Sequence, residues 1–276
     1  MPAISLVVCL CKEGDHLRRL LQETRDCYDD LVVVHDGPDD TGVRPIVENA
    51  GGRFFEGKRE YQQEPHWPFA WGAATHDWIL RLDADEFPSG EMRQWLKEFR
   101  RAPEPPPDIS GYTCIWPMWN GHKTVSKKWP AGRLFFFHRQ RVRFFGMCEQ
   151  TPVLDGRSEA LDFILHHQPT RKSYGLSNIL LRKQSRRVAT IVALSLLKKP
   201  TDLACWRWQS EVWPEHWEQI RQRPLWTAFK RLIKGTVSTL RTQWKSEHHF
   251  FPIEAISGPV HQTLICLKFR LLRRVR

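Results

Sequence analysis

Three short, almost wholly apolar runs alternate with amphipathic segments over the first 90 residues, and this alternation restricts the fold more than any other feature. The runs are 4–10 (ISLVVCL), 31–34 (LVVV) and 78–82 (WILRL). Apolar runs this short and rich in β-branched residues are typical of strands buried on both faces of a parallel sheet.

The segments between these runs have the pattern of helices. In 15–24 (DHLRRLLQET), the first Asp is placed to cap a helix and the leucines share one face. Segments 46–50 and 67–75 predict two further short helices. The resulting β-α-β-α-β order predicts an α/β fold, with a mostly parallel, Rossmann-like sheet flanked by helices.

The rest of the chain divides into a second set of strands and a helical end. A Pro-rich loop at 102–111 precedes strand-like segments at 112–119, 132–146 and 161–167. Helical periodicity begins near residue 178. We therefore expect one α/β domain over 1–185 and a helical, basic region over 186–276.

Acidic side chains follow two of the predicted strands. Asp83, Asp85 and Glu86 come directly after 78–82, and HDGPDD (35–40) follows 31–34. The carboxyl ends of parallel strands meet at one edge of a sheet, so we expect the two groups to lie together. Carboxylates this close repel one another unless a cation is present. A strand-end Asp-x-Asp suits Mg²⁺ or Mn²⁺, and the alternative is a solvated turn.

Four blocks of the sequence, taken in order, resemble those of a known enzyme family. They are ISLVVCLCKE (4–13), VVVHDGPDD (32–40), DWILRLDADE (77–86) and RLFFFHRQRVRFFGMCEQ (133–150). Together they resemble the family-two glycosyltransferases of the GT-A fold. The most similar branch contains lipopolysaccharide-core and related polysaccharide or glycan β-glycosyltransferases. The resemblance covers about the first 185 residues, and the third block is its most specific part.

The resemblance implies a site for a nucleotide sugar. Asp83 and Asp85 match the Asp-x-Asp that binds the sugar diphosphate through Mn²⁺ or Mg²⁺. Glu13, Asp36 and Asp40 match acidic positions that contact the nucleotide. In such a site the metal stabilises the diphosphate as a leaving group.

Glu149 matches the Glu of the family's His-Glu motif, at or near the position of the catalytic base. A base there would deprotonate the acceptor hydroxyl as it attacks the anomeric carbon, with inversion. The chain departs from the family pattern in three places. CLCKE (9–13) replaces the usual Asn-Thr-x-Asn-Glu, His35 replaces an Asp, and Cys148 replaces the His beside Glu149.

Several other side chains near these blocks have two interpretations. His166, with the adjacent His167, follows a predicted strand and is a candidate metal ligand or a buried His bonded to the backbone. The arginines either balance the acidic site or a diphosphate, or point to solvent (Arg133, Arg141, Arg143). The tryptophans either stack on a sugar or fill the core (Trp116, Trp119, Trp129).

The cysteine content gives an indication of the cellular compartment. Seven Cys with no Cys-x-x-Cys pair indicate reduced thiols and a cytoplasmic protein. No apolar run approaches the ~20 residues that a membrane-spanning helix needs.

Net positive charge is confined to the last third of the chain. Residues 171–276 hold 21 Lys+Arg and 6 Asp+Glu, whereas residues 1–170 hold 21 and 25. Within this region, apolar residues recur at helical spacing and would form one stripe of a helix (Trp226, Phe229, Ile233, Val237, Leu240, Trp244). The basic residues of the same segment lie largely off this stripe. A basic amphipathic helix with flanking Trp favours an anionic membrane surface. The alternative is that the stripe packs on the first domain.

The sequence therefore favours a metal-dependent, inverting glycosyltransferase of the hexosyltransferase type. It would use a nucleotide-sugar donor and a glycan or lipid-linked acceptor at the cytosolic face of the membrane. A nucleotidyltransferase is the first alternative, but it should show a Gly-rich, Arg-containing phosphate loop that CLCKEGDH (9–16) does not provide. A nucleic-acid-binding protein that uses the basic tail, although disfavoured as a partner class, and a non-catalytic relative are the others.

Overall fold

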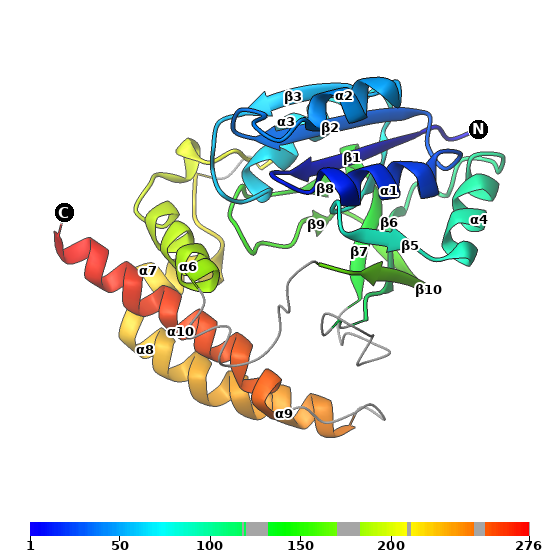
Figure 1. Ribbon diagram of the computed structural model, residues 1–276. Helices are drawn as coiled ribbons and strands as arrows, with labels where there is room; N and C mark the ends of the chain where they lie inside the picture. The colour runs from blue at the N-terminus through cyan, green and yellow to red at the C-terminus, as the bar shows by residue number, and fades with distance from the viewer. Residues whose placement is uncertain (118, 120–131, 170–182, 209–210, 246–251, 276) are drawn as a thin grey trace.

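The computed structural model describes residues 1–117, 119, 132–169, 183–208, 211–245 and 252–275. Figure 1 shows a sheet with helices on both faces and a separate layer of C-terminal helices at one side. The two chain ends lie on opposite sides of the molecule.

Eight strands of the described chain form the main sheet, in the order β3-β2-β1-β4-β7-β6-β10-β5. Strands β3, β2, β1 and β4 are parallel; β7 joins β4 antiparallel. Strands β8 and β9 form a separate antiparallel pair. The strands are β1 (Ile4–Leu10), β2 (Asp30–Asp36), β3 (Arg53–Gly57), β4 (Trp78–Arg81), β5 (Glu86–Pro88), β6 (Ile109–Ile115), β7 (Arg133–His138), β8 (Val142–Arg143), β9 (Val153–Leu154) and β10 (Arg157–His167).

Successive residues of β1 enter two different cores because strand side chains alternate between faces. Leu6 and Val8 pack with α1 (Gly14–Thr24), α2 (Val43–Asn49) and α4 (Gly90–Phe99). Val7 and Cys9 pack on the opposite face with α3 (Trp67–Ala73), which follows the short helix η1 (Glu64–His66). This burial on both faces explains why the strand reads as a continuous apolar run.

The α/β class and the sheet flanked by helices are confirmed. The strands and helices expected in the first 90 residues are present within a few residues of their predicted bounds. Three strands were not predicted: β3 and β5, which lie at the two edges of the main sheet, and the two-residue strand β9.

The C-terminal helices form a layer with its own core. They are α6 (Lys183–Ser195), α7 (Glu215–Gln222), α8 (Pro224–Lys230), the π-helical segment η4 (Arg231–Gly235), α9 (Thr236–Lys245) and α10 (Pro252–Val275). Short 3-10 helices occur at η2 (Arg139–Arg141) and η3 (Pro200–Asp202). The layer packs on Phe145, Met147 and Cys148 of the first domain. The predicted boundary at 185/186 falls inside α6.

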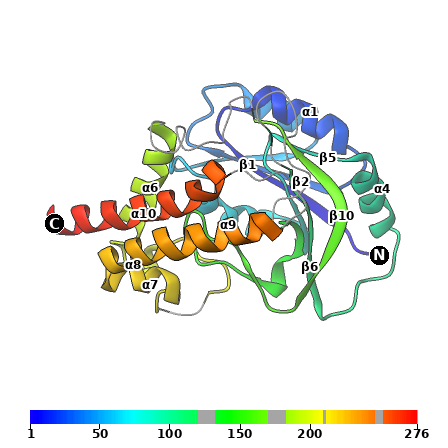
Figure 2. The same cartoon turned by 90° about the horizontal axis from the view of Figure 1, so that it is seen from below.

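Figure 2 shows α8 and α9 running beside α10. Among the described residues, no helix combines the length and the apolar character required to cross a membrane.

Candidate functional site

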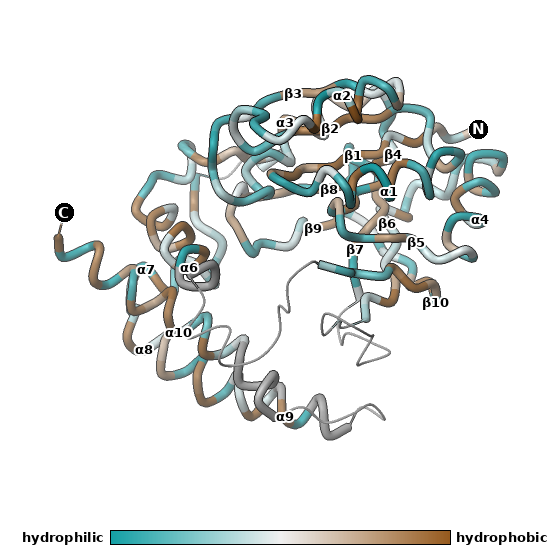
Figure 3. The backbone as a smooth tube through the Cα atoms, viewed as in Figure 1, coloured by the Kyte–Doolittle hydropathy of each residue, from teal (hydrophilic) through white to brown (hydrophobic). Residues whose placement is uncertain are grey.

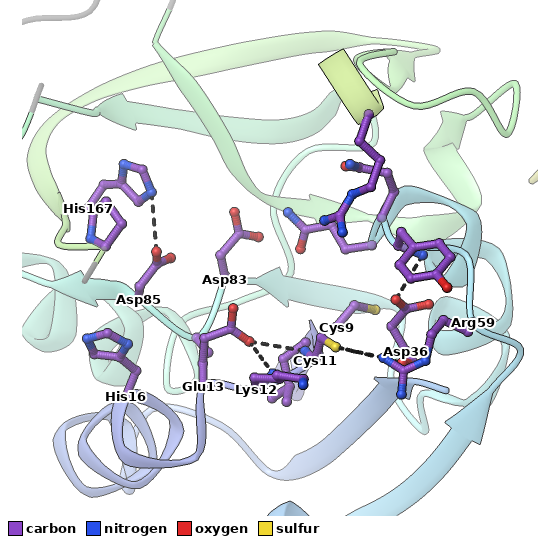
Figure 4. Close-up of a pocket in the computed structure, with 17 residues that line it drawn as sticks. Cys9, Cys11, Lys12, Glu13, His16, Asp36, Arg59, Asp83, Asp85 and His167 are labelled. Carbon is purple, nitrogen blue, oxygen red and sulfur yellow. Dashed lines mark hydrogen bonds and ion pairs between the residues drawn. The ribbon is translucent and has the colours of Figure 1, made fainter. Parts of the chain in front are cut away.

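A cavity of about 770 Å³ opens at the carboxyl ends of β1, β2 and β4. Strand β1 pairs with β2 on one side and with β4 on the other, so the order in which strands join the sheet reverses at β1. Such a switch point is where open α/β sheets bind ligands, and this volume is typical of small-molecule pockets. Figure 4 shows Asp83 and Asp85 toward one end of the cavity, and Asp36 and Arg59 toward the other.

Glu13 shapes the first loop of the cavity. Its Oε2 accepts hydrogen bonds from the backbone N–H groups of Cys11 and Lys12, at 3.1 and 2.9 Å. These bonds curl the chain between β1 and α1. Glu13 lines the cavity, as do Cys11 and Lys12.

Asp36 also lines the cavity and organises a second loop. Its carboxylate accepts backbone N–H bonds from Glu60 and Tyr61, and a bond from the ring of His66 at 2.9 Å. Burial alone would raise the Asp36 pKa, but these donors hold it below its usual value. Tyr61, whose N–H is one of these donors, has a φ of 61°, a conformation that is uncommon outside glycine.

Arg133, on β7, is the internal cation of the acidic cluster. Its Nη2 lies 3.0 Å from Asp83 Oδ2 and 3.1 Å from Glu86 Oε1. Burial would raise the pKa of Asp83, but Arg133 lowers it, whereas burial keeps the pKa of Glu86 raised. Of the three arginines considered from the sequence, Arg133 balances the acidic site. Arg141 donates to a backbone carbonyl of Ile109, and Arg143 pairs with Asp155.

Glu86 stabilises the turn that follows β4. Its side chain is fully buried, and its Oε2 accepts the backbone N–H of Asp83 at 2.9 Å. Its Oε1 accepts the indole N–H of Trp116 at 2.8 Å. The ring of Trp116 stacks on His167, with the ring centres 4.5 Å apart. Glu86 and Trp116 thus fix the turn that presents Asp83 and Asp85.

The remaining oxygens at this turn fit a divalent cation. Asp83 Oδ1 is buried and makes no hydrogen bond within the described part of the chain, and Asp85 lines the same cavity. Among described residues, no group of three or more His, Cys, Asp or Glu side chains is arranged to hold a metal. One or two carboxylates are the usual protein share of a Mg²⁺ site completed by water and phosphate.

His167, rather than His166, lies in the cavity. Its Nε2 is 3.5 Å from Asp85 Oδ2. Burial would lower the His167 pKa, but Asp85 raises it above the usual value. His166 pairs with Phe87 in the sheet, and neighbouring strand residues point to opposite faces. The structure therefore brings His167 to Asp85 and does not bring His166 there.

Asp40 and Glu149 do not line the cavity. Asp40 is exposed, and it is Asp39 that accepts the backbone N–H groups of Val43 and Arg44 at the start of α2. Glu149 is held at φ 60°, and its Oε1 lies 2.8 Å from His261 Nε2 on α10.

Cationic groups that were not predicted complete the cavity. Arg59 follows β3 and lies against Gly37, where an added Cβ would be 2.5 Å from the guanidinium. The glycine therefore permits this close approach. Arg187 comes from α6, and its guanidinium lies over the ring of Tyr61 at 5.2 Å. The helical region thus supplies part of the cavity wall.

Comparison with known proteins yields structural similarity alone. No family model and no curated protein matches the chain. S. aureus TarS aligns with TM-score 0.40 and 10% identity, over 99% of this chain and 55% of its own; TarS 1-349 gives 0.41 and 10%, over 99% and 92%. A CMP:2-keto-3-deoxy-manno-octonic acid synthetase complexed with CTP gives 0.30 and 12%, over 56% and 64%. At these scores the function has to be inferred from the site itself.

Proposed function

We propose that the protein is a metal-dependent, inverting glycosyltransferase that takes a sugar from a nucleotide-sugar donor. The observation that carries the proposal is the pairing of two chemistries in one cavity. Asp83 and Asp85 offer carboxylate oxygens, while Lys12, Arg59 and Arg187 offer positive charge. A nucleotide diphosphate bound with a divalent cation requires both. The motif resemblance to GT-A enzymes supports the same assignment.

The chain's own residues have separate tasks in this proposal. Bound Mn²⁺ or Mg²⁺ supplies the charge that stabilises the departing diphosphate. Asp85 and the buried Oδ1 of Asp83 are its proposed ligands, while Arg133 and Glu86 fix the turn that carries them. Lys12 and Arg59 face the phosphates, and Asp36 and Glu13 hold the loops around the nucleotide.

We propose that Glu149, which lies outside the lining of the donor cavity and pairs with His261, is the base that accepts the proton of an acceptor hydroxyl bound on that side. Glu149→Gln should keep donor affinity within about twofold and lower kcat by about 10²–10⁴, because the amide does not accept a proton. Donor titration and initial-rate measurement on the same preparation check this. Glu215→Gln makes the same change at an exposed carboxylate of α7 and is the matched control, with kcat expected to be unchanged. Normal turnover of Glu149→Gln would move the base elsewhere.

The proposed acceptor is a glycan or a lipid-linked glycan, as in polysaccharide or lipopolysaccharide assembly, with the enzyme peripheral on the cytosolic side of the membrane. The large basic excess of the helical region supports this placement.

A thermal-shift screen of nucleotide sugars, with Mn²⁺ and with EDTA, tests the proposed function. We expect one nucleotide sugar to raise the melting temperature by several degrees with Mn²⁺ and by far less with EDTA, because only ligands of the folded state stabilise it. A rise in melting temperature with a nucleoside triphosphate, and with no nucleotide sugar, would favour a nucleotidyltransferase. No response to either class would contradict both enzymatic functions.

A further inference from the structure

The helix formed by α8, η4 and α9 packs with its small residues inward. Thr227 and Ala228 are buried, and Ala228 belongs to the same core as Ile265 and Phe269 of α10. At Gly235 an added Cβ would lie 3.2 Å from Pro259 of α10. The contact between the two helices is therefore close and made by small side chains.

The large apolar residues of the same helix point outward. We call Trp226, Phe229, Ile233 and Val237 the apolar stripe; their exposed fractions are 59, 56, 48 and 60%. A surface helix ordinarily buries its apolar face and exposes its polar one. A contiguous exposed apolar row marks an interaction surface. The sequence alone left open whether this stripe covers the first domain, and the exposure argues against that.

The charge around the stripe has one sign. Residues 219–245 contain seven Lys or Arg and no Asp or Glu, and residues 255–276 contain five and none. In Figure 3 the helices α8 and α10 alternate between hydrophobic and hydrophilic residues along their length. A binding partner that matches this face therefore has to offer both an apolar environment and negative charge.

An arginine-lined cavity adjoins the stripe. It has a volume of about 410 Å³ between the start of α8 and the end of α10. We call it the arginine pocket; it is lined by Arg223, Pro224, Leu225, Trp226, Arg270, Arg273 and Arg274. It contains no carboxylate, and Trp226 belongs to both the pocket and the stripe. Guanidinium groups match phosphate oxygens in geometry and charge.

We infer that this face docks on an anionic phospholipid bilayer, with the apolar stripe at the acyl boundary and the arginine pocket on a lipid phosphate. A second copy of the chain is disfavoured, since it would bring two all-basic faces together. Nucleic acid would match the charge and leave the stripe in water. The bilayer alone satisfies both features. The inference does not depend on the proposed transfer reaction.

Sedimentation of the full chain with vesicles tests the inference. We expect binding to vesicles that contain phosphatidylglycerol and at least about tenfold weaker binding to pure phosphatidylcholine. The stripe variant Trp226→Ser with Phe229→Ser and the pocket variant Arg270→Gln with Arg274→Gln should each weaken binding about tenfold. Because these side chains are mostly at the surface, circular dichroism should show unchanged folding.

Matched controls separate docking from bulk charge and bulk hydrophobicity. Arg18→Gln with Arg25→Gln removes the same charge from the first domain, and Phe69→Ser removes a ring that is 54% exposed. Neither should change vesicle binding. Normal binding by the stripe variant, or equal loss in the charge control, would overturn the inference. So would stripe-dependent dimerisation or nucleic-acid binding without vesicle binding.

Discussion

Asp85→Asn is expected to weaken Mn²⁺ binding, and Mn²⁺-dependent donor binding, by more than about 100-fold. Asp85 lines the cavity and, among the ion pairs of the described chain, contacts His167 alone, whereas Asp83 is already paired with the guanidinium of Arg133. An amide keeps the size of the side chain and removes its charge, which a hard cation requires. Calorimetric titration with Mn²⁺ alone, and then with the nucleotide sugar that gives the largest thermal shift, measures both losses.

Asp40→Asn is the matched control for this experiment. Asp40 is an exposed carboxylate outside the cavity lining, and the substitution is chemically identical. We expect Asp40→Asn to bind Mn²⁺ and donor as the wild type does. If Asp85→Asn bound both with wild-type affinity, the assigned metal site would be incorrect even if the protein transferred sugars. Equal losses in the two variants would indicate a general charge effect.

Arg133→Met is expected to lower the free energy of unfolding by about 3–5 kcal/mol. The guanidinium is 20% exposed and neutralises Asp83 and the fully buried Glu86. Methionine fills much of the same volume but leaves two carboxylates without their cation. Urea unfolding at neutral pH, followed by circular dichroism, measures the change.

The stability experiment includes a control and a rescue. Arg143→Met breaks an exposed pair with Asp155 and should change the free energy of unfolding little. Adding Glu86→Gln to Arg133→Met should recover part of the loss, because one buried charge is removed. Additive losses in the double variant would show that Arg133 stabilises the fold by packing alone.

The parallel core of the fold could be predicted from sequence because its signal is local. Ile4–Leu10 is buried on both faces, so every position is apolar and the run is conspicuous. Arg53–Gly57 lies at the edge of the sheet and is partly exposed, so it lacks such a run. Glu86–Pro88 becomes a strand only because it pairs with β10, some 80 residues later in the chain.

The part of the candidate site that lies at the ends of the parallel strands could be predicted from the sequence. Glu13, Asp36, Asp83 and Asp85 line one cavity because parallel strands end at the same edge. Arg187 joins them from α6, and nothing local in the sequence indicates that approach. His166 and His167 are neighbours, so the choice between them depends on which face of β10 each occupies.

The wall contributed by α6 has a practical consequence for dissecting this protein. A truncated fragment ending at residue 185 would keep every strand and both carboxylates of the Asp-x-Asp. It would lose Arg187 from the cavity and uncover Phe145 and Met147, which the C-terminal layer buries. Such a fragment would represent the full chain poorly, because the uncovered apolar surface favours aggregation and the cavity lacks one of its lining arginines.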